Sequence, residues 1–174
     1  PDVAQALQDG KTVVLATSAA RPERSVAGFF ASDFWCYPMF RGIAERKGVP
    51  PAPGTLGLLI DAGHPALSAF PTGAASDWQW QPIAYHGRPL VLDGLDVQPI
   101  VQAVDNFERN HKLGLLLEAR VGPGRLLLCA SDLTHHLDRP EVRALLQSLL
   151  AYAASPAFAP PAALSPDWLR DTLA

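Results

Sequence analysis

The chain has 174 residues, of which 48% are hydrophobic and 18% are charged, and its formal net charge is -3. This length fits one domain, and the hydrophobic fraction is sufficient for a sizeable core. The small negative charge, without a block of like charges, argues against nucleic acid or a membrane as partner, because both attract basic patches. No hydrophobic run approaches the roughly 18 residues of a membrane span.

The first 17 residues predict a helix followed by a strand. In DVAQALQDG, Val3, Ala6 and Leu7 share one face of a helix, and Gly10 suits its C-cap. The continuous hydrophobic run at 11–17 is typical of a strand covered on both faces. A helix, a glycine and a strand form half of an αβ unit. We therefore expect the domain to be truncated at its N-terminus, as part of a longer protein.

The middle of the chain is less regular. The stretch SVAGFFASDFWCYPMF holds six aromatic residues among 16 and indicates a helix followed by a loop over the core. Further along, hydrophobic runs and prolines predict a strand at 55–61, a short helix from His64 to Phe70, and strands at 89–95 and 99–107.

The last third of the chain has the clearest pattern. Two hydrophobic strands, at 113–121 and 125–130, flank Gly122-Pro123-Gly124, which predicts a hairpin. An amphipathic helix follows in RPEVRALLQSLLAYAAS, and a short helix is expected in the tail at PDWLRDTL. The hydrophobic stripe of the first helix comprises Val142, Leu145, Leu146, Leu149 and Leu150. Strands mixed with helices predict an α/β layer fold with a central sheet.

Glu118 is the most unusual carboxylate, because it interrupts the otherwise hydrophobic strand LGLLLEARV. Such a carboxylate must be paired or must face a cleft. The alternatives are an ion pair with a nearby basic residue or exposure at the strand's edge. The basic residues considered are Arg109, Lys112 and Arg120. Glycoside hydrolysis needs two carboxyl groups about 5 to 10 Å apart, and the candidates are Asp105, Glu108, Glu118 and Asp132.

Thiol, metal and nucleotide chemistry have weak support. Cys36 and Cys129 lie far apart, outside any metal-ligand spacing, and are expected to be reduced, partly buried and inert. A thiol site of Cys129 with His135 or His136, or a metal site of these histidines with Asp132, is disfavoured, because neighbouring histidines in a loop are usually solvated. No GxSxG, GxGxxG or P-loop pattern occurs. The sequence therefore predicts neither a metal nor a cofactor.

Two segments are candidates for surface contacts. Trp78 and Trp80, in SDWQWQPI, would lie on opposite sides of a helix but on one face of a strand. They could form a sugar platform or a contact with another domain, with Ser76 capping a short turn that Pro82 ends. The polar stretch at 105–114 is either a connection or a docking loop. The candidate contact residues are Trp35, Trp78, Trp80, Asp105, Asn106, Arg109 and Glu118.

Four segments resemble the C-terminal region of large bacterial family-two glycoside hydrolases, the group with β-galactosidase-like and β-mannosidase-like enzymes. They are HPALSAFPT, SDWQW, IVQAVDNFERNHKLGLLLEARVGPGRLLLCASDL and RPEVRALLQSLLAY. The resemblance extends from ALQDGKTVVLAT to Phe158 and is most specific from Val101 to Leu133. It implies a flavodoxin-like or class I glutamine amidotransferase-like domain, with a central, mostly parallel sheet flanked by helices and a C-terminal β-hairpin. Residues 1–158 would form this domain, and 159–174 a tail.

The resemblance also implies a function. The catalytic glutamates of these enzymes lie on an upstream barrel, so no residue here would inherit their roles, and neither cysteine matches the amidotransferase arrangement. The chain would be a non-catalytic accessory domain that contacts the catalytic domains of its own polypeptide and helps shape the site for β-linked sugars. A carbohydrate-binding module that uses exposed tryptophans and an independent hydrolase are the alternatives. A periplasmic or extracellular location is the expectation for such a parent enzyme.

Overall fold

The computed structural model describes residues 2–28, 37–48, 54–106 and 109–173. Its α-helices are α1 (Val3–Gln8), α2 (Tyr37–Arg46), α3 (Gln81–Tyr85), α4 (Pro140–Ala153) and α5 (Pro166–Thr172). Its strands are β1 (Thr12–Ala16), β2 (Gly57–Ile60), β3 (Leu90–Val91), β4 (Val101–Val104), β5 (Lys112–Val121), β6 (Gly124–Cys129) and β7 (Ala163–Leu164). Short 3-10 turns are η1 (Pro22–Arg24), η2 (Pro65–Leu67), η3 (Trp78–Trp80) and η4 (Thr134–His136). None of the helices in these segments is long and apolar enough to cross a membrane.

The strands form one mixed sheet in the order β1-β6-β5-β4-β2, and β3 and β7 pair with parts of β5. The β1–β6 and β5–β7 pairs are parallel. The β2–β4, β3–β5, β4–β5 and β5–β6 pairs are antiparallel. The sheet is therefore mostly antiparallel, and the mostly parallel sheet that the resemblance implied is not what the described strands form. Short links such as the β5–β6 turn allow only antiparallel neighbours, because a parallel pair needs a long crossover.

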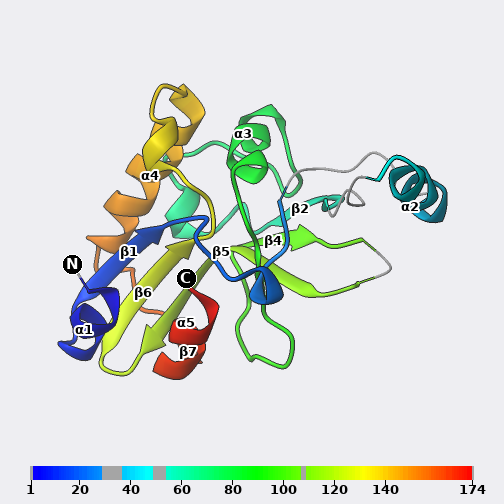
Figure 1. Cartoon of the computed structure of the whole chain (residues 1–174). Coiled ribbons are helices and arrows are strands. Elements are labelled where there is room, and N and C mark those ends of the chain that lie inside the picture. Colours follow the sequence, from blue (N-terminus) through cyan, green and yellow to red (C-terminus); the bar gives the residue numbers. More distant parts are fainter. Residues whose placement is uncertain (1, 29–36, 49–53, 107–108, 174) are drawn as a thin grey trace.

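Helices cover both faces of this sheet, which gives an α/β architecture (Figure 1). On one face, Leu145 and Leu149 of α4 belong to a hydrophobic cluster with Leu116 and Leu127 of the central strands. On the other face, Leu7 of α1 and Leu169 of α5 join a second cluster with neighbouring side chains of β5 and β6. Side chains alternate between the two faces along a strand. The central hairpin is therefore buried on both sides.

The β5–β6 hairpin confirms the strongest local prediction, with strands at 112–121 and 124–129. Gly122 has a φ of 57°, a conformation that glycine adopts at little cost. Gly124 has a different role, because a Cβ at this position would lie 2.5 Å from the backbone oxygen of Leu7. The missing side chain thus allows α1 to pack directly on the start of β6.

The other predicted elements fit less uniformly. The helix and strand of the first 17 residues, the strand near 55–61, the long helix α4 and the tail helix α5 are present. Strand β1 has hydrophobic side chains packed against the clusters on both faces of the sheet, as predicted, but most of its residues are only half-buried because it lies at the end of the strand order. The strand predicted at 89–95 is reduced to Leu90–Val91. Leu150 lies outside the buried stripe of α4 and is exposed. The aromatic stretch before α2 lies largely outside the described residues.

Candidate functional site

Glu118 lies in β5, on the face of the sheet that α4 covers, and its side chain is only 9% exposed. Its Oε2 atom accepts a hydrogen bond of 2.7 Å from the hydroxyl of Tyr152, near the end of α4. Burial, together with the adjacent negative charge of Glu118, raises the pKa of Tyr152 above its usual range. The tyrosine therefore keeps its proton at neutral pH and acts as a fixed donor to the carboxylate.

His64 approaches the other oxygen of the same carboxylate. Its Nε2 atom lies 4.0 Å from Oε1 of Glu118. The imidazole is held in place at the start of η2, where Nδ1 accepts a hydrogen bond of 3.2 Å from the backbone N–H of Ala66. It also packs edge-on against the ring of Tyr152, with centroids 5.4 Å apart. Three distant segments of the chain thus meet at one carboxylate.

Glu118 and His64 together line a cavity of about 580 Å³. Polar side chains of Asp61, Gln98 and Gln102 also line it. The remaining lining residues are Leu59, Ile60, Ala74, Pro99, Ile100, Pro161 and Ala162. Glu118 therefore faces a cleft, which was one of the two positions that the sequence analysis allowed for a carboxylate in a hydrophobic strand. The alternative of an ion pair with Arg109, Lys112 or Arg120 is wrong. Among the described residues the neighbours of the Glu118 carboxylate are Tyr152 and His64, because α4 and η2 cover this face of β5.

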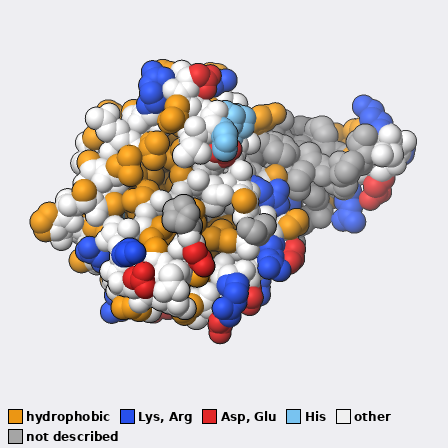
Figure 2. Space-filling model, turned by 60° about the vertical axis from the view of Figure 1, so that its left-hand side comes forward, with side chains coloured by type: hydrophobic (Ala, Val, Ile, Leu, Met, Phe, Trp, Pro, Cys, Tyr) orange, Lys and Arg blue, Asp and Glu red, His pale blue; other side chains and the backbone are white. Residues whose placement is uncertain are grey.

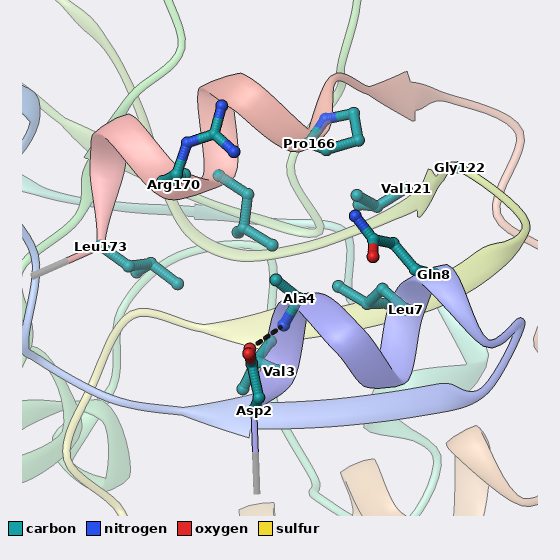
Figure 3. A pocket seen from close by; sticks show the side chains of 11 residues that line it. Asp2, Val3, Ala4, Leu7, Gln8, Val121, Gly122, Pro166, Arg170 and Leu173 are labelled. Carbon is teal, nitrogen blue, oxygen red and sulfur yellow. Dashed lines mark hydrogen bonds between the residues drawn. The ribbon is translucent and has the colours of Figure 1, made fainter.

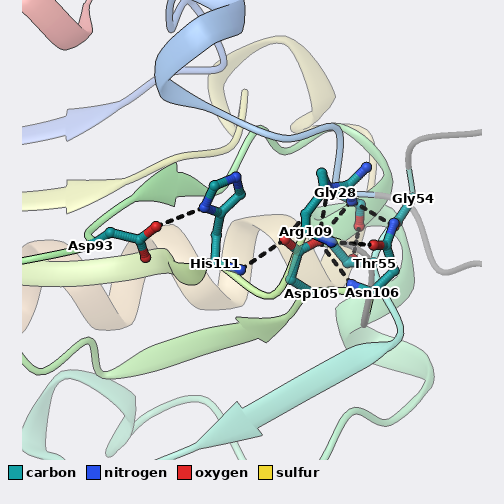
Figure 4. A network of polar contacts seen from close by, with 8 residues as sticks. All are labelled: Gly28, Gly54, Thr55, Asp93, Asp105, Asn106, Arg109 and His111. Carbon is teal, nitrogen blue, oxygen red and sulfur yellow. Dashed lines mark hydrogen bonds and ion pairs between the residues drawn. The ribbon is translucent and has the colours of Figure 1, made fainter.

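Asp105, Asn106 and Arg109 come together at a different place, beyond the end of β4 (Figure 4). Nη2 of Arg109 lies 2.6 Å from the buried carboxylate of Asp105 and also donates to the carbonyl of Gly54. Asn106 accepts a hydrogen bond from the backbone N–H of Arg109. Asp105 accepts a further bond from the backbone N–H of His111. This network ties the β4–β5 connection to the segment before β2.

The ion pair of His111 with Asp93 adjoins this network and was not predicted (Figure 4). The His111 Nδ1 atom lies 2.7 Å from Oδ2 of Asp93, and the backbone N–H of Lys112 donates to Oδ1. The His111 hydrogen bond, followed by that of Lys112, lowers the pKa of Asp93. The pair fastens the turn after β3 to the start of β5. The sequence does not predict this pair, because Asp93 and His111 are isolated polar residues that lie far apart along the chain.

The two tryptophans of η3 have opposite environments. Trp78 is 89% exposed, whereas Trp80 is fully buried. The Nε1 atom of Trp80 donates to Thr72 at 2.8 Å, and its ring packs edge-on against Phe70. Trp80 is therefore a core residue, not a contact residue. Trp35 lies outside the described residues.

The turn that carries Trp78 borders a hollow of about 300 Å³, lined by Ser76, Asp77, Trp78 and Gln81. The N-cap position of η3 is Asp77, not Ser76 as was predicted, and the side chain of Asp77 makes no capping hydrogen bond. Pro82 does not end the turn. It stands near the start of α3, where its missing N–H is tolerated.

Cys129 is buried in the sheet, and burial raises the pKa of its thiol to about 12. It is therefore a thiol at neutral pH and unsuited to nucleophilic attack.

His135 pairs with Asp132 at 2.8 Å, while His136 stacks on His86 with centroids 3.6 Å apart. In the part of the chain that the structure describes, no group of three His, Cys, Asp or Glu side chains is placed to hold a metal ion. Cys36 and Glu108 lie outside that part.

A second, mostly apolar cavity of about 220 Å³ lies between α1 and α5 (Figure 3). Val3, Leu7, Leu169 and Leu173 provide most of its hydrophobic lining, and Arg170 borders it. Asp2 caps α1 by accepting a hydrogen bond from the N–H of Ala4. This cavity lacks the convergent polar groups that make the Glu118 cavity the better candidate site.

No curated protein matches the chain. The sequence pattern of one family, described as a domain of unknown function (DUF8487), matches residues 1–174. Because the match covers the whole sequence, the chain belongs to the DUF8487 family.

Proposed function

We propose that the chain is a non-catalytic accessory domain of a glycoside hydrolase that acts on β-linked sugars. It would pack against the catalytic domains of the same polypeptide and help to shape their substrate site. The resemblance of the segment from Val101 to Leu133 to family-two enzymes motivates the choice of parent enzyme. The exposure of Trp78 is the structural observation that carries the proposed role.

Trp78 is an unusual surface residue, because 89% of a large aromatic side chain contacts solvent. Tryptophan buries more apolar area than any other side chain and is enriched among the residues that dominate protein interfaces. Its neighbour Trp80 is fully buried in the core, whereas the ring of Trp78 is mostly in contact with solvent and therefore contributes little to packing within this domain. A contact with another domain would remove its apolar surface from water.

A broader hydrophobic surface supports docking as well. Figure 2 shows hydrophobic side chains gathered on the side of the molecule that carries α1, β1 and α4. Among these elements, β1 is an edge strand with half-buried residues, and Leu150 of α4 is exposed. Contiguous hydrophobic surface of this kind commonly marks an interaction site. A catalytic domain of the same polypeptide is the partner that the resemblance suggests.

Two of the candidate catalytic residues are in environments that do not suit catalysis, which supports a non-catalytic role. Cys129 is buried with a raised pKa, and Asp105 is engaged by Arg109 and backbone donors. The same resemblance leads us to propose a degenerate relative of the flavodoxin-like and amidotransferase-like folds. The parallel β1–β6 pair and the helices on both faces of the sheet are compatible with such an origin.

Carbohydrate binding by Trp78 is the second candidate function. The hollow beside its ring is lined by the polar side chains of Ser76, Asp77 and Gln81. A flat aromatic ring flanked by hydrogen-bonding groups suits a sugar, which has apolar C–H faces and hydroxyl edges. Only one of the two neighbouring tryptophans is available for this purpose, because Trp80 is buried.

The docking role can be tested in trans with the complete natural polypeptide divided into two parts. The isolated chain is mixed with the remainder of the polypeptide, and their association is measured by sedimentation velocity. We expect association with the unmodified chain and at least a tenfold loss of affinity with Trp78→Ala, since interface tryptophans are often dominant contacts. Leu137→Ala, which alters another exposed apolar residue, is the matched control and should bind normally.

Three outcomes would contradict the proposal. The first is a complete polypeptide without a glycoside hydrolase domain. The second is no association of the two parts. The third is association that Trp78→Ala and Leu137→Ala leave equally strong. If the isolated chain instead binds methyl β-glycosides, and Trp78→Ala abolishes that binding, the carbohydrate-binding candidate replaces domain docking.

A further inference from the structure

The gap between His64 and Glu118 has a defined hydrogen-bonding polarity. Because Nδ1 of His64 accepts the N–H of Ala66, the proton of the neutral ring is on Nε2. This N–H donor lies 4.0 Å from Oε1 of Glu118, which is too far for a direct hydrogen bond. Within the described part of the chain, Oε1 accepts no hydrogen bond, whereas Oε2 is occupied by Tyr152.

A hydroxyl group fits this gap in both distance and polarity. Hydrogen bonds to oxygen have lengths of about 2.7 to 3.0 Å, so one oxygen atom can contact both groups across a separation of 4.0 Å. That hydroxyl would accept the Nε2–H of His64 and donate its own proton to Oε1 of Glu118. An ammonium group could satisfy the carboxylate but has no acceptor for the His64 donor.

The rest of the cavity extends the same chemistry. Gln98 and Gln102 add side-chain amides, which both donate and accept, and Asp61 adds a second carboxylate acceptor. Proline and aliphatic side chains form the remaining walls, among them Pro99, Ile100 and Pro161. Polar groups set among apolar walls match a sugar ring. A volume of about 580 Å³ lies within the usual range for small-molecule sites.

We propose that this cavity binds a neutral polyhydroxyl compound of the size of a sugar ring, with one hydroxyl bridging Nε2 of His64 and Oε1 of Glu118. The site is separate from the hollow at Trp78 and does not depend on the parent enzyme. It can therefore exist even if the chain does not dock on a glycoside hydrolase. It can also be absent while the docking role is correct.

The test is a titration of the chain, with ¹³C-labelled histidine, followed by NMR. The probes are the methyl β-glycosides of galactose, glucose and mannose, with glycerol and ethylammonium chloride for comparison. We expect saturable shifts of the His64 signals with at least one glycoside at millimolar concentration. Glycerol should bind at least tenfold more weakly, because it spans fewer of the polar groups, and ethylammonium should not compete.

Two substitutions address the bridging groups. Glu118→Gln keeps the side-chain size and an acceptor for Tyr152 but removes the charge, so it should weaken glycoside binding roughly tenfold, as expected for a charge-assisted hydrogen bond. His64→Asn keeps a short side chain that can cap η2 but lacks the Nε2 donor, and should have a similar effect. Because His64→Asn has no His64 signal to follow by NMR, glycoside binding to this variant and to Glu118→Gln is measured by calorimetry. Thermal melts identify any variant that fails to fold.

The matched control is Glu23→Gln, which makes the same chemical change at an exposed residue outside the cavity. It should bind as tightly as the unmodified chain, as should Trp78→Ala. The proposal is overturned if no glycoside binds, if both Glu118→Gln and His64→Asn bind normally in the folded state, or if glycerol or ethylammonium binds as tightly as the glycosides. Loss of binding in Trp78→Ala alone would place the sugar at the other hollow and also overturn it.

Discussion

At the scale of single residues, Glu118 shows what a sequence can and cannot predict. Its position in a hydrophobic strand correctly indicated a carboxylate that must be paired or face a cleft. Its partners were not predictable, because His64 and Tyr152 are distant in sequence and carry no local mark of their roles. His64 was identified only as the start of a short helix. Tyr152 falls within the amphipathic helix without being part of the predicted stripe.

The Tyr152–Glu118 hydrogen bond should contribute measurably to stability. Tyr152→Phe removes the hydroxyl and leaves Oε2 of a buried carboxylate without its donor. The cost should be about 1 to 3 kcal/mol in the free energy of unfolding, the usual range for a buried group that loses its partner. Urea unfolding followed by circular dichroism measures this. Tyr85→Phe, at an exposed tyrosine, is the control; equal stability of the two variants would refute the structural role of the bond.

The Asp93–His111 pair should make stability depend on pH. Hydrogen bonds hold the pKa of Asp93 below its usual range, so the folded state binds its proton less readily than the unfolded state. Its contribution is therefore present above about pH 4, the unfolded pKa of an aspartate, and is lost as the pH falls through the folded value. Because both side chains are substantially exposed, we expect well under 1 kcal/mol.

Asp93→Asn tests this contribution by urea unfolding at pH 7 and at pH 3. The variant should be slightly less stable than the unmodified chain at pH 7, and the difference should shrink at pH 3. Asp171→Asn, at an exposed aspartate of α5, serves as the control for removing one negative charge. A difference that is unchanged or larger at pH 3 would be incompatible with the lowered pKa of Asp93.

At the scale of elements, local sequence patterns predicted the hairpin and the helices, but they could not predict which distant strands pair with each other. Gly122-Pro123-Gly124 between two hydrophobic runs is sufficient to indicate the β5–β6 turn. By contrast, Thr12 pairs with Arg125, and their side chains form a hydrogen bond across 113 residues of sequence. The half-exposed position of β1 follows from this sheet order, which the hydrophobicity of the strand alone cannot reveal.

Gly124 provides a prediction about how α1 packs on the sheet. In Gly124→Ala the new Cβ would lie 2.5 Å from the backbone oxygen of Leu7 and 2.7 Å from its Cα, so α1 must move. We expect a loss of about 1 to 3 kcal/mol, typical of overpacking, measured by urea unfolding. Gly73→Ala is the matched control, since nothing lies within 4 Å of a Cβ there. Equal stabilities would show that α1 does not pack on β6 as described.

At the scale of the whole molecule, the candidate site exists only because the sheet and its covering helix assemble. Glu118 comes from β5, Tyr152 from α4, and His64 from the start of η2. Neither motif nor spacing can reveal such a site, because its members are linked through packing and not through sequence order. In the same way, the sequence does not reveal which tryptophan of η3 is exposed and which is buried, because this depends on the packing of Trp80 against Phe70.

We propose that the chain supports catalysis by other domains and does not catalyse hydrolysis itself. The most direct measurement compares the isolated chain with its complete natural polypeptide in the hydrolysis of p-nitrophenyl β-galactoside, β-glucoside and β-mannoside. We predict that the complete polypeptide hydrolyses at least one of them and that the isolated chain hydrolyses none. Hydrolysis by the isolated chain that Glu118→Gln abolishes, or an inactive complete polypeptide, would contradict the claim.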